Sequence, residues 1–214
     1  MKYLFFDIEC ADGGKATICS FGYVIADMDF NILDHDDIIM NPEGRFYLTG
    51  RAGRPDVNLA YPMEYFKKAP NFKAFHSRIK ELVENEEYYV VGHSVRDDVT
   101  YLNKACARYK LEPFKFKFFD TQKMFKEITG EKKQKSLENA LLAMEVNEFF
   151  ISHRSDEDAR ATMMLLEALL RKTNMSFEAY INSTDRCTGY TENGKSSWDY
   201  IPPESESKRL RENK

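Results

Sequence analysis

Hydrophobic positions along the chain follow two spacings, one typical of strands and one typical of helices. Short runs rich in aromatic and β-branched residues predict strands at 2–8, 17–26, roughly 30–40, 88–92 and 116–119. Apolar residues three or four positions apart predict helices at 72–82, 94–108, 121–128, 136–144 and 155–171. The first three strands follow one another directly, and the later strands alternate with helices. This order predicts an α/β fold with a mixed five-stranded sheet, an antiparallel meander plus parallel strands, flanked by helices.

Two stretches lack this patterning. Residues 41–62 are rich in glycine, proline and arginine, which predicts a long surface loop of the kind that often carries function. Beyond about residue 182 the chain becomes polar and ends in a charged segment. We therefore expect one domain over residues 1–182 and a loosely ordered polar tail over residues 183–214.

Composition narrows the class of protein. The chain has 214 residues, 43% of them hydrophobic, and a net charge of −4. This charge argues against a uniformly basic protein that binds duplex DNA tightly, but it suits one that grips a short strand end through metal ions. The four cysteines are scattered without metal-binding spacing, which predicts reduced thiols and a cytoplasmic location. No hydrophobic run approaches membrane-spanning length, so we expect no membrane partner.

The segment Phe5-Phe6-Asp7-Ile8-Glu9 joins a strand of buried type to two acids. Because strand side chains alternate, Asp7 and Glu9 point to the same face of the sheet. Two neighbouring carboxylates at the end of a core strand repel each other and are costly to desolvate, so a divalent cation is expected beside them. The alternative is a strand end that enters solvent, where the two acids need no partner.

A third acid, Asp98, stands out in its predicted helix. Val95 lies three positions before it, and Leu102 and Ala105 lie four and seven positions after it, which places Asp98 on the apolar face in the first turn. Asp97 is turned by about 100° towards solvent, close to a capping-box position. Asp98 is therefore the acid expected to point inward.

The last predicted helix shows the same contrast. Asp158 shares its stripe with Leu165, whereas Asp156 aligns with Arg160. Asp158 is therefore expected to face the core, near a helix N-terminus where the dipole favours an anion. His153 lies five residues earlier and could reach the same site, although a histidine in front of a helix is more often structural.

Asp7, Glu9, Asp98 and Asp158 thus supply four inward carboxylates, joined by His153. Oxygen donors without cysteine suit Mg²⁺ or Mn²⁺ and not structural zinc. Such clusters commonly hold two ions about 3.5–4 Å apart, the arrangement used to cleave phosphodiester bonds.

Three motifs built on these residues resemble those of a known family. Asp7-Ile8-Glu9, Gly92-His93-Ser94-x-x-x-Asp98 and His153-x-x-x-x-Asp158 are similar to the three motifs of the DnaQ-like (DEDDh) 3′→5′ exonucleases. That superfamily includes the DNA polymerase III epsilon subunit and oligoribonuclease. Each motif is short, but all three occur in order and with suitable spacing. The resemblance covers about residues 1–172 and implies an RNase H-like fold.

The resemblance also implies a two-metal mechanism, with a role for each acid. Asp7, Glu9 and Asp158 would hold the ion that activates water, and Asp98 would help at the second ion. His153 would be the general base. The catalytic residues implied are therefore His153, Asp7 and Glu9, and the products are nucleoside 5′-monophosphates.

Substrate contacts are less sharply defined, because the chain departs from the family pattern where the strand is held. Ser94 stands where an asparagine is usual, and Asp97 stands where an aromatic residue is usual. The family's His-Gly-Ile-type loop is replaced by Asn58-Leu59-Ala60-Tyr61.

Other substrate contacts follow by analogy or by residue type. The resemblance places backbone groups of Cys10 and Ala11 near the terminal nucleotide. Tyr61 or Phe21 would stack on a base unless they pack in the core, and Arg54 would contact a phosphate unless it is simply a solvated loop residue.

The function expected from these residues is a metal-dependent 3′→5′ exonuclease acting on single-stranded 3′ ends, with DNA slightly favoured over RNA. The alternatives are an oligoribonuclease-like exoribonuclease, or a non-catalytic nucleic-acid-binding or polymerase-associated module with the same fold. A structural protein with fortuitous acids is the least favoured. Whether a polymerase or a second copy of the chain is a partner stays open.

Overall fold

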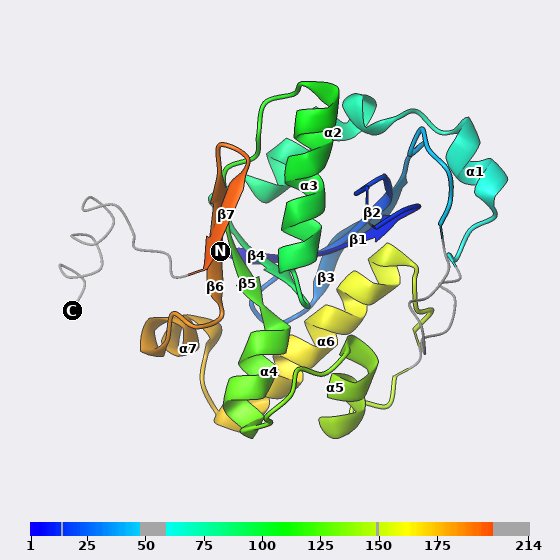
Figure 1. Cartoon of the computed structure of the whole chain (residues 1–214). Coiled ribbons are helices and arrows are strands. Elements are labelled where there is room, and N and C mark those ends of the chain that lie inside the picture. The colour runs from blue at the N-terminus through cyan, green and yellow to red at the C-terminus, as the bar shows by residue number, and fades with distance from the viewer. Residues whose placement is uncertain (14, 48–58, 149, 199–214) are drawn as a thin grey trace.

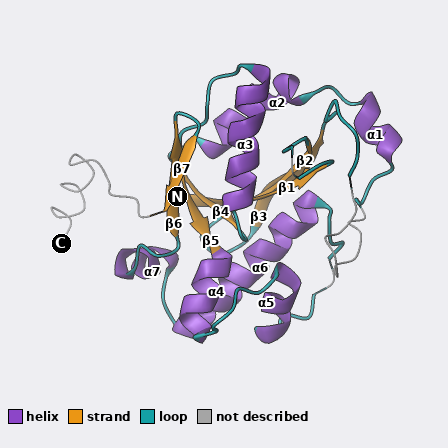
Figure 2. Cartoon of the chain, in the orientation of Figure 1, coloured by secondary structure: helices purple, strands orange, loops and turns teal. Residues whose placement is uncertain are grey.

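The computed structural model of the protein describes residues 1–13, 15–47, 59–148 and 150–198. In these residues seven strands form one sheet in the order β3-β2-β1-β4-β5-β6-β7 (Figures 1 and 2). The strands are β1 Lys2–Cys10, β2 Ile18–Ala26, β3 Ile32–Ile39, β4 Tyr88–Gly92, β5 Phe116–Asp120, β6 Thr188–Glu192 and β7 Lys195–Trp198. β1, β4 and β5 pair in parallel, and the other neighbours pair antiparallel.

Helices cover both faces of this sheet (Figure 2). The helices are α1 Met63–Lys68, α2 Phe72–Val83, α3 Arg96–Tyr109, α4 Thr121–Thr129, α5 Leu137–Ala143, α6 Ser155–Thr173 and α7 Phe177–Ser183. α2 and α3 share a core with Leu4 and Phe6 of β1. α4, α5, α6 and α7 share a second core with Tyr3 and Phe5. The alternation of strand side chains thus sends the residues of β1 to two separate cores.

β1 is the central strand of the site-bearing half of the sheet. It pairs with β2 on one side and with β4 on the other, and Tyr3, Leu4, Phe5 and Phe6 are all at most 1% exposed. Asp7 continues the row of Tyr3 and Phe5, on the face that α6 covers. An apolar, rigid strand therefore leads directly into the first acid.

The predicted α/β fold, with an antiparallel meander and parallel strands, is confirmed, but the sheet is larger than expected. It has seven strands in the described residues and not five, because β6 and β7 add an antiparallel hairpin beside β5. The hairpin lies within residues 183–214, which we expected to be a loose tail, and that expectation is wrong for 188–198. Trp198 packs on Phe118 with 5.3 Å between ring centroids, which holds the hairpin on the core. Residues 199–214 lie outside the described residues.

Some local features also differ from expectation. α1 and α7 were not anticipated from the apolar spacing, because each is a short helix with few buried residues. α3 begins at Arg96, directly after Val95, and the preceding Ser94 has a φ of 58°.

Among the helices of the described residues, none combines the length and the apolar character that a membrane span requires. All four cysteines carry free thiols, and three of them are buried.

Candidate metal centre

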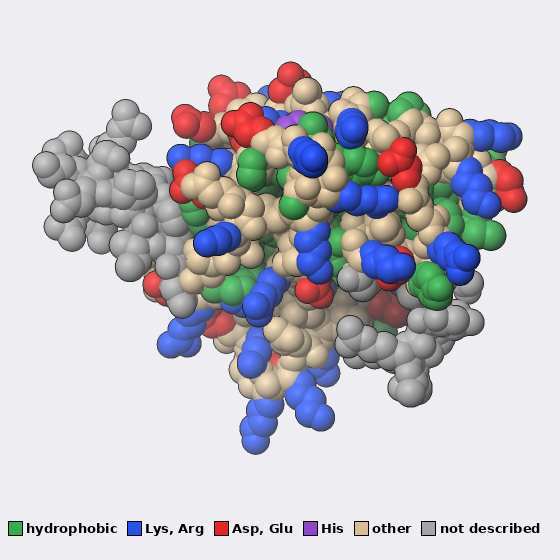
Figure 3. Space-filling model, turned by 45° about the horizontal axis from the view of Figure 1, so that its top comes forward, with side chains coloured by type: hydrophobic (Ala, Val, Ile, Leu, Met, Phe, Trp, Pro, Cys, Tyr) green, Lys and Arg blue, Asp and Glu red, His purple; other side chains and the backbone are tan. Residues whose placement is uncertain are grey.

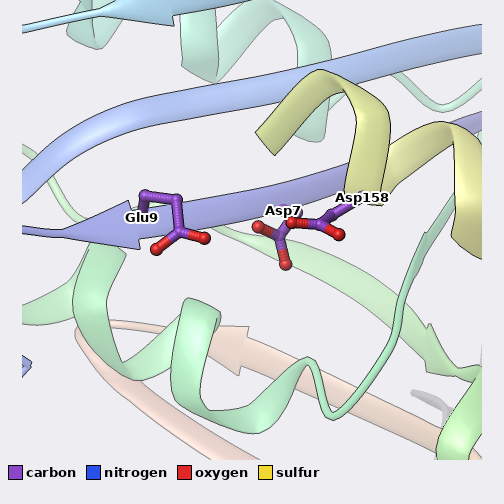
Figure 4. Close-up of side chains that lie close together, drawn as sticks. All are labelled: Asp7, Glu9 and Asp158. Atoms are coloured by element: carbon purple, nitrogen blue, oxygen red, sulfur yellow. The ribbon is translucent and has the colours of Figure 1, made fainter. Parts of the chain in front are cut away.

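Three carboxylates converge where β1 meets the first turn of α6. Asp7 and Glu9 come from β1 and Asp158 comes from α6 (Figure 4). One ligand oxygen of each residue lies within 4.8 Å of those of the other two. This is the group that the alternation of β1 and the helix stripe of Asp158 predicted. Its donor atoms are all carboxylate oxygens, which suits a hard divalent cation such as Mg²⁺ or Mn²⁺.

Gly22 of β2 allows α6 to approach the sheet this closely. It pairs with Asp7 in the β1–β2 register. A Cβ atom at Gly22 would lie 2.0 Å from the backbone nitrogen of Asp156 and 2.0 Å from the carbonyl carbon of Ser155. The backbone of the first turn of α6 therefore rests directly on β2, and Asp158 is carried to Asp7.

Asp98 approaches the same acids from the other helical layer. It lies in the first turn of α3 and is 7% exposed, whereas its neighbour Asp97 is exposed. Asp98 is not among the three residues whose oxygens lie within 4.8 Å of one another, but its charge is the largest charge effect on Asp7. The predicted distinction between an inward Asp98 and an outward Asp97 agrees with this placement.

His153 closes the site from the loop before α6. Its backbone N–H donates to Oδ2 of Asp158 at 2.9 Å, and its ring Nδ1 lies 3.3 Å from Oε1 of Glu9. Its φ is 65°, a left-handed backbone conformation that turns the chain into the helix. The side chain is 48% exposed, so the ring lies at the solvent-exposed edge of the acidic cluster.

The electrostatics of the acids fit a site for cations. Burial raises the pKa of Asp7 well above its ordinary value, and the charges of Asp98, Asp158 and Glu9 raise it further. Burial, followed by the charges of Asp97 and Glu9, also raises the pKa of Asp98. Burial and the charge of Glu9 raise the pKa of Asp158 to about 7. These acids resist simultaneous ionisation, and a bound cation would relieve that repulsion.

A polar network behind the metal centre was missed in the sequence. Asp37 of β3 pairs with Gly22, so Asp7, Gly22 and Asp37 form one row across three strands. Oδ1 of Asp37 accepts hydrogen bonds from Ser20 and from Ser155, the latter at 2.8 Å. This network ties the N-terminus of α6 to β2 and β3. The register of the two hairpins is the signal that could have shown it.

Asp156 is buried as well, although it lies on a more polar stripe of the helix than Asp158. It is 5% exposed and accepts two hydrogen bonds from the Arg154 guanidinium, at 2.8 and 3.0 Å. The start of α6 lies against the sheet at Gly22, and this close approach also buries the side of the helix that carries Asp156. Asp158, in contrast, remains directed at Asp7 and Glu9.

A second buried network holds the segment that precedes Asp98. Oδ1 of Asp120 accepts hydrogen bonds from the backbone N–H of Ser94 at 3.0 Å and of Gln122 at 2.8 Å. Burial lowers the pKa of His93 to about 4, so its ring is neutral and lies 3.0 Å from the Thr121 hydroxyl. The backbone N–H of Ser94 thus fixes the start of α3. A contact of Ser94 with substrate stays a prediction.

One of the predicted substrate contacts, that of Phe21, is wrong. Phe21 is fully buried and stacks on Phe6 with 5.5 Å between ring centroids, so it cannot stack on a nucleotide. The backbone N–H of Ala11 donates to Thr17, and its carbonyl accepts from Tyr47. That Ala11 lies near the terminal nucleotide stays a prediction. Cys10 is half-buried, and its side chain joins the core on the α2 and α3 side of the sheet.

The remaining predicted contacts stay predictions. Tyr61 is partly buried, its ring lies 5.8 Å from the Arg154 guanidinium carbon, and it packs edge-on against Phe66. It therefore lies near the start of α6 but also packs in the small core around Phe66. Arg54 lies outside the described residues.

Comparisons with known proteins agree with this arrangement. A family model described as the DNA polymerase III subunit epsilon-like, C-terminal domain (DEDDh_C) matches residues 63–169, half of the chain. None of the curated proteins matches the sequence.

Several solved structures share the fold. A 3′-exonuclease solved in 3′-end specific recognition of a histone mRNA stem-loop has 14% identity and a TM-score of 0.69, over 94% of this chain and 72% of that chain. E. coli Exonuclease I in complex with a dA16 oligonucleotide has 17% identity and a TM-score of 0.64, over 85% of this chain and 43% of that chain. Exonuclease X in complex with 5′ overhanging duplex DNA has 15% identity and a TM-score of 0.58, over 83% and 95%. The fold is thus the RNase H-like fold of DEDDh exonucleases, and with the matching family model it follows that this chain belongs to the DNA polymerase III subunit epsilon-like DEDDh family.

Proposed function

We propose that this protein is a metal-dependent 3′→5′ exonuclease that hydrolyses phosphodiester bonds at single-stranded 3′ ends and releases nucleoside 5′-monophosphates. The observation that carries the proposal is the convergence of Asp7, Glu9 and Asp158, with Asp98 and His153 beside them. These residues come from distant parts of a chain whose family is defined by such acids. Clustering these carboxylates without a cation destabilises the fold, because they are partly desolvated and repel one another. A catalytic role explains why all five residues are present together.

The acids fit two divalent cations, Mg²⁺ or Mn²⁺. Asp7, Glu9 and Asp158 would hold one ion, and Asp7 with Asp98 would hold the other. When bound, these ions lower the pKa of a water molecule and offset the negative charge that develops on the phosphate. The raised pKa values of Asp7, Asp98 and Asp158 support this assignment, because a cation stabilises their ionised forms.

His153 is the residue placed to take the proton from the attacking water. Glu9 orients its ring through Nδ1, and the hydrogen bond from its backbone to Asp158 fixes its distance from the acids. The hydrogen bond to Glu9 and the charges of Glu9 and Asp158 raise the pKa of His153 in the metal-free site. Cations on these carboxylates would offset that effect and favour the neutral ring, which a general base requires.

The substrate proposed is a single-stranded end, with DNA slightly favoured over RNA. Related structures hold an RNA stem-loop, a dA16 oligonucleotide and an overhanging DNA duplex. In the face shown in Figure 3, lysine and arginine side chains are spread among acidic ones. This suits a short single strand better than a long duplex, which a continuous basic surface would hold. A cytoplasmic location and a polymerase partner stay predictions.

The direct test uses end-labelled DNA and RNA oligonucleotides with the full chain, in Mg²⁺, in Mn²⁺ and with a chelator. Shortening from the 3′ end, one nucleotide at a time and only with metal, is the expected result. Binding without degradation would instead favour the non-catalytic module with the same fold. Faster degradation of short RNA than of DNA would favour the oligoribonuclease-like alternative.

Two neighbouring acids provide a matched pair of variants. Asp98→Ala is expected to lower the cleavage rate at least ~100-fold, because it removes a buried carboxylate beside Asp7. Asp97→Ala is expected to leave the rate within about threefold, since Asp97 is exposed. Initial rates on a labelled oligonucleotide measure both. Equal losses in the two variants would show that the helix-face assignment is wrong.

His153→Ala separates proton transfer from metal binding. The cleavage rate is expected to fall by about 10²–10⁴-fold, the usual contribution of a general base. Mn²⁺ affinity, measured by calorimetry, is expected to stay within about threefold of the unmodified protein. His35→Ala, at an exposed histidine of β3, is the control. A His153→Ala variant that cleaves at the normal rate would remove His153 from the mechanism.

A further inference from the structure

An exposed aromatic residue, Tyr47, is attached to the segment that directly follows Glu9. Tyr47 is 53% exposed. Its backbone N–H donates to the carbonyl of Ala11 at 2.6 Å. Ala11 is two residues beyond Glu9, a separation of roughly 7 Å along an extended chain. The Tyr47 backbone is therefore anchored to a residue that lies about one nucleotide's length from Glu9.

The segment that carries Tyr47 is fixed from both sides. The preceding Phe46 packs on Phe66, with 5.8 Å between ring centroids, in the small core that also contains Ala11. On the other side, Ala11 starts a closed turn, in which its N–H donates to the carbonyl of Thr17 at 2.9 Å. The Asp12 N–H donates to the Thr17 hydroxyl at 2.9 Å. The exposed ring is thus presented by a rigid base, which lowers the entropy cost of binding a ligand.

A cation accompanies the ring. The Lys15 ammonium lies 5.7 Å from the centroid of the Tyr47 ring and 3.8 Å from a carboxylate oxygen of Asp12. The Lys15 side chain is 73% exposed, and an exposed ion pair of this length contributes little to stability. Lys15 can therefore move its charge to a phosphate at low cost.

We infer that Tyr47 and Lys15 form a nucleotide subsite beside the metal centre, in which a base of the single-stranded end stacks on the Tyr47 ring and Lys15 contacts a phosphate of the same strand. The inference rests on the proposed function and deepens it. A polyanion that enters an acidic centre needs a cation and an uncharged contact at the rim, and these two side chains supply both. Stacking accepts any base, so the subsite adds affinity without sequence preference.

The test is a binding measurement that needs no cleavage. Fluorescence anisotropy of a short labelled single-stranded DNA is recorded with the full chain, with Ca²⁺ in place of Mg²⁺ and separately with a chelator. Tyr47→Ala is expected to weaken binding about 5–100-fold, the loss of one stacked base. Tyr47→Phe is expected to bind within about twofold of the unmodified protein, because stacking does not use the hydroxyl. Tyr65→Ala, at a tyrosine of α1 that is 62% exposed, is the control.

The contribution of Lys15 has its own readout. Lys15→Gln is expected to reduce the slope of log affinity against log salt concentration by about 0.7, the value for one phosphate contact on a single strand. Lys172→Gln, at the exposed C-terminal end of α6, is expected to leave the slope unchanged. Unchanged melting temperatures check that each variant is folded.

The outcomes distinguish this inference from the proposed function. Unchanged affinity in Tyr47→Ala, or equal losses in Tyr47→Ala and Tyr47→Phe, would overturn the subsite while leaving the nuclease proposal intact. If Tyr47→Ala and Lys15→Gln change binding as expected but the protein never cleaves DNA or RNA, the subsite is supported and the exonuclease proposal is refuted. A protein that binds no oligonucleotide in either condition would overturn the subsite as well.

Discussion

Asp7→Asn is expected to reduce cleavage at least ~10³-fold and, at the same time, to make the metal-free protein more stable. Asp7 is the acid on which the charges of Asp98, Asp158 and Glu9 all act, so its carboxylate is central to cation binding. The amide of Asn has the same shape as the carboxylate but no charge, so the repulsion between position 7 and the other three acids is removed. Cleavage assays and thermal melts, with and without Mn²⁺, measure both effects. The melting temperature of the variant should no longer rise with Mn²⁺.

The predicted effect on stability depends on pH, and the raised pKa of Asp158 gives its direction. The pKa of Asp158 is raised from its ordinary value near 4 to about 7, so between these values the folded protein binds more protons than the unfolded chain. The metal-free protein should therefore lose stability as pH rises from about 4 to about 7, by up to ~1.4 kcal/mol per pH unit for each such acid. Asp7→Asn should flatten this slope. A metal-free protein that becomes more stable over that range would contradict the electrostatic picture of the site.

Gly22→Ala is expected to damage stability and activity together. The added Cβ would lie 2.0 Å from backbone atoms at the start of α6, and backbone cannot move aside as a flexible side chain can. We expect a loss of at least ~3 kcal/mol in the free energy of unfolding, or roughly 6–12 °C in melting temperature. Because α6 carries Asp158 and follows His153, its displacement should also lower the cleavage rate more than tenfold.

Gly44→Ala is the matched control for this substitution. A Cβ at Gly44 would meet the Thr17 side chain at 3.4 Å, an ordinary contact. Its melting temperature and cleavage rate should stay close to those of the unmodified protein. If Gly22→Ala behaved in the same way, the close approach of α6 to β2 would not be what positions Asp158.

The acids could be predicted because their directions follow from local geometry. Alternation along β1 places Asp7 and Glu9 on one face, and the stripe of α3 separates Asp98 from Asp97. The same alternation could have excluded Phe21. It pairs with Ile8, which points to the face opposite Asp7, so it had to be buried under α2 and α3.

What escaped prediction depends on contacts between distant segments. Nothing near Asp156 in the sequence shows that a glycine on β2 lets the helix backbone rest on the sheet. The β6–β7 hairpin did have a local signal, the Asn193-Gly194 turn, in which both residues have positive φ. The strands beside it are short and polar, so they resemble a tail until Trp198 is seen against Phe118.

The position of β1 has a consequence for how the protein matures. β1 precedes the other elements of the domain in the sequence. Its pairing is nevertheless completed only when β4 is in place, and its acids meet Asp158 only after α6 has docked. Contacts this distant along the chain form late in folding. A ribosome-bound chain that stops before α6 would therefore lack the assembled centre, and under the proposed function it could not cleave nucleic acid until synthesis of the domain is nearly finished.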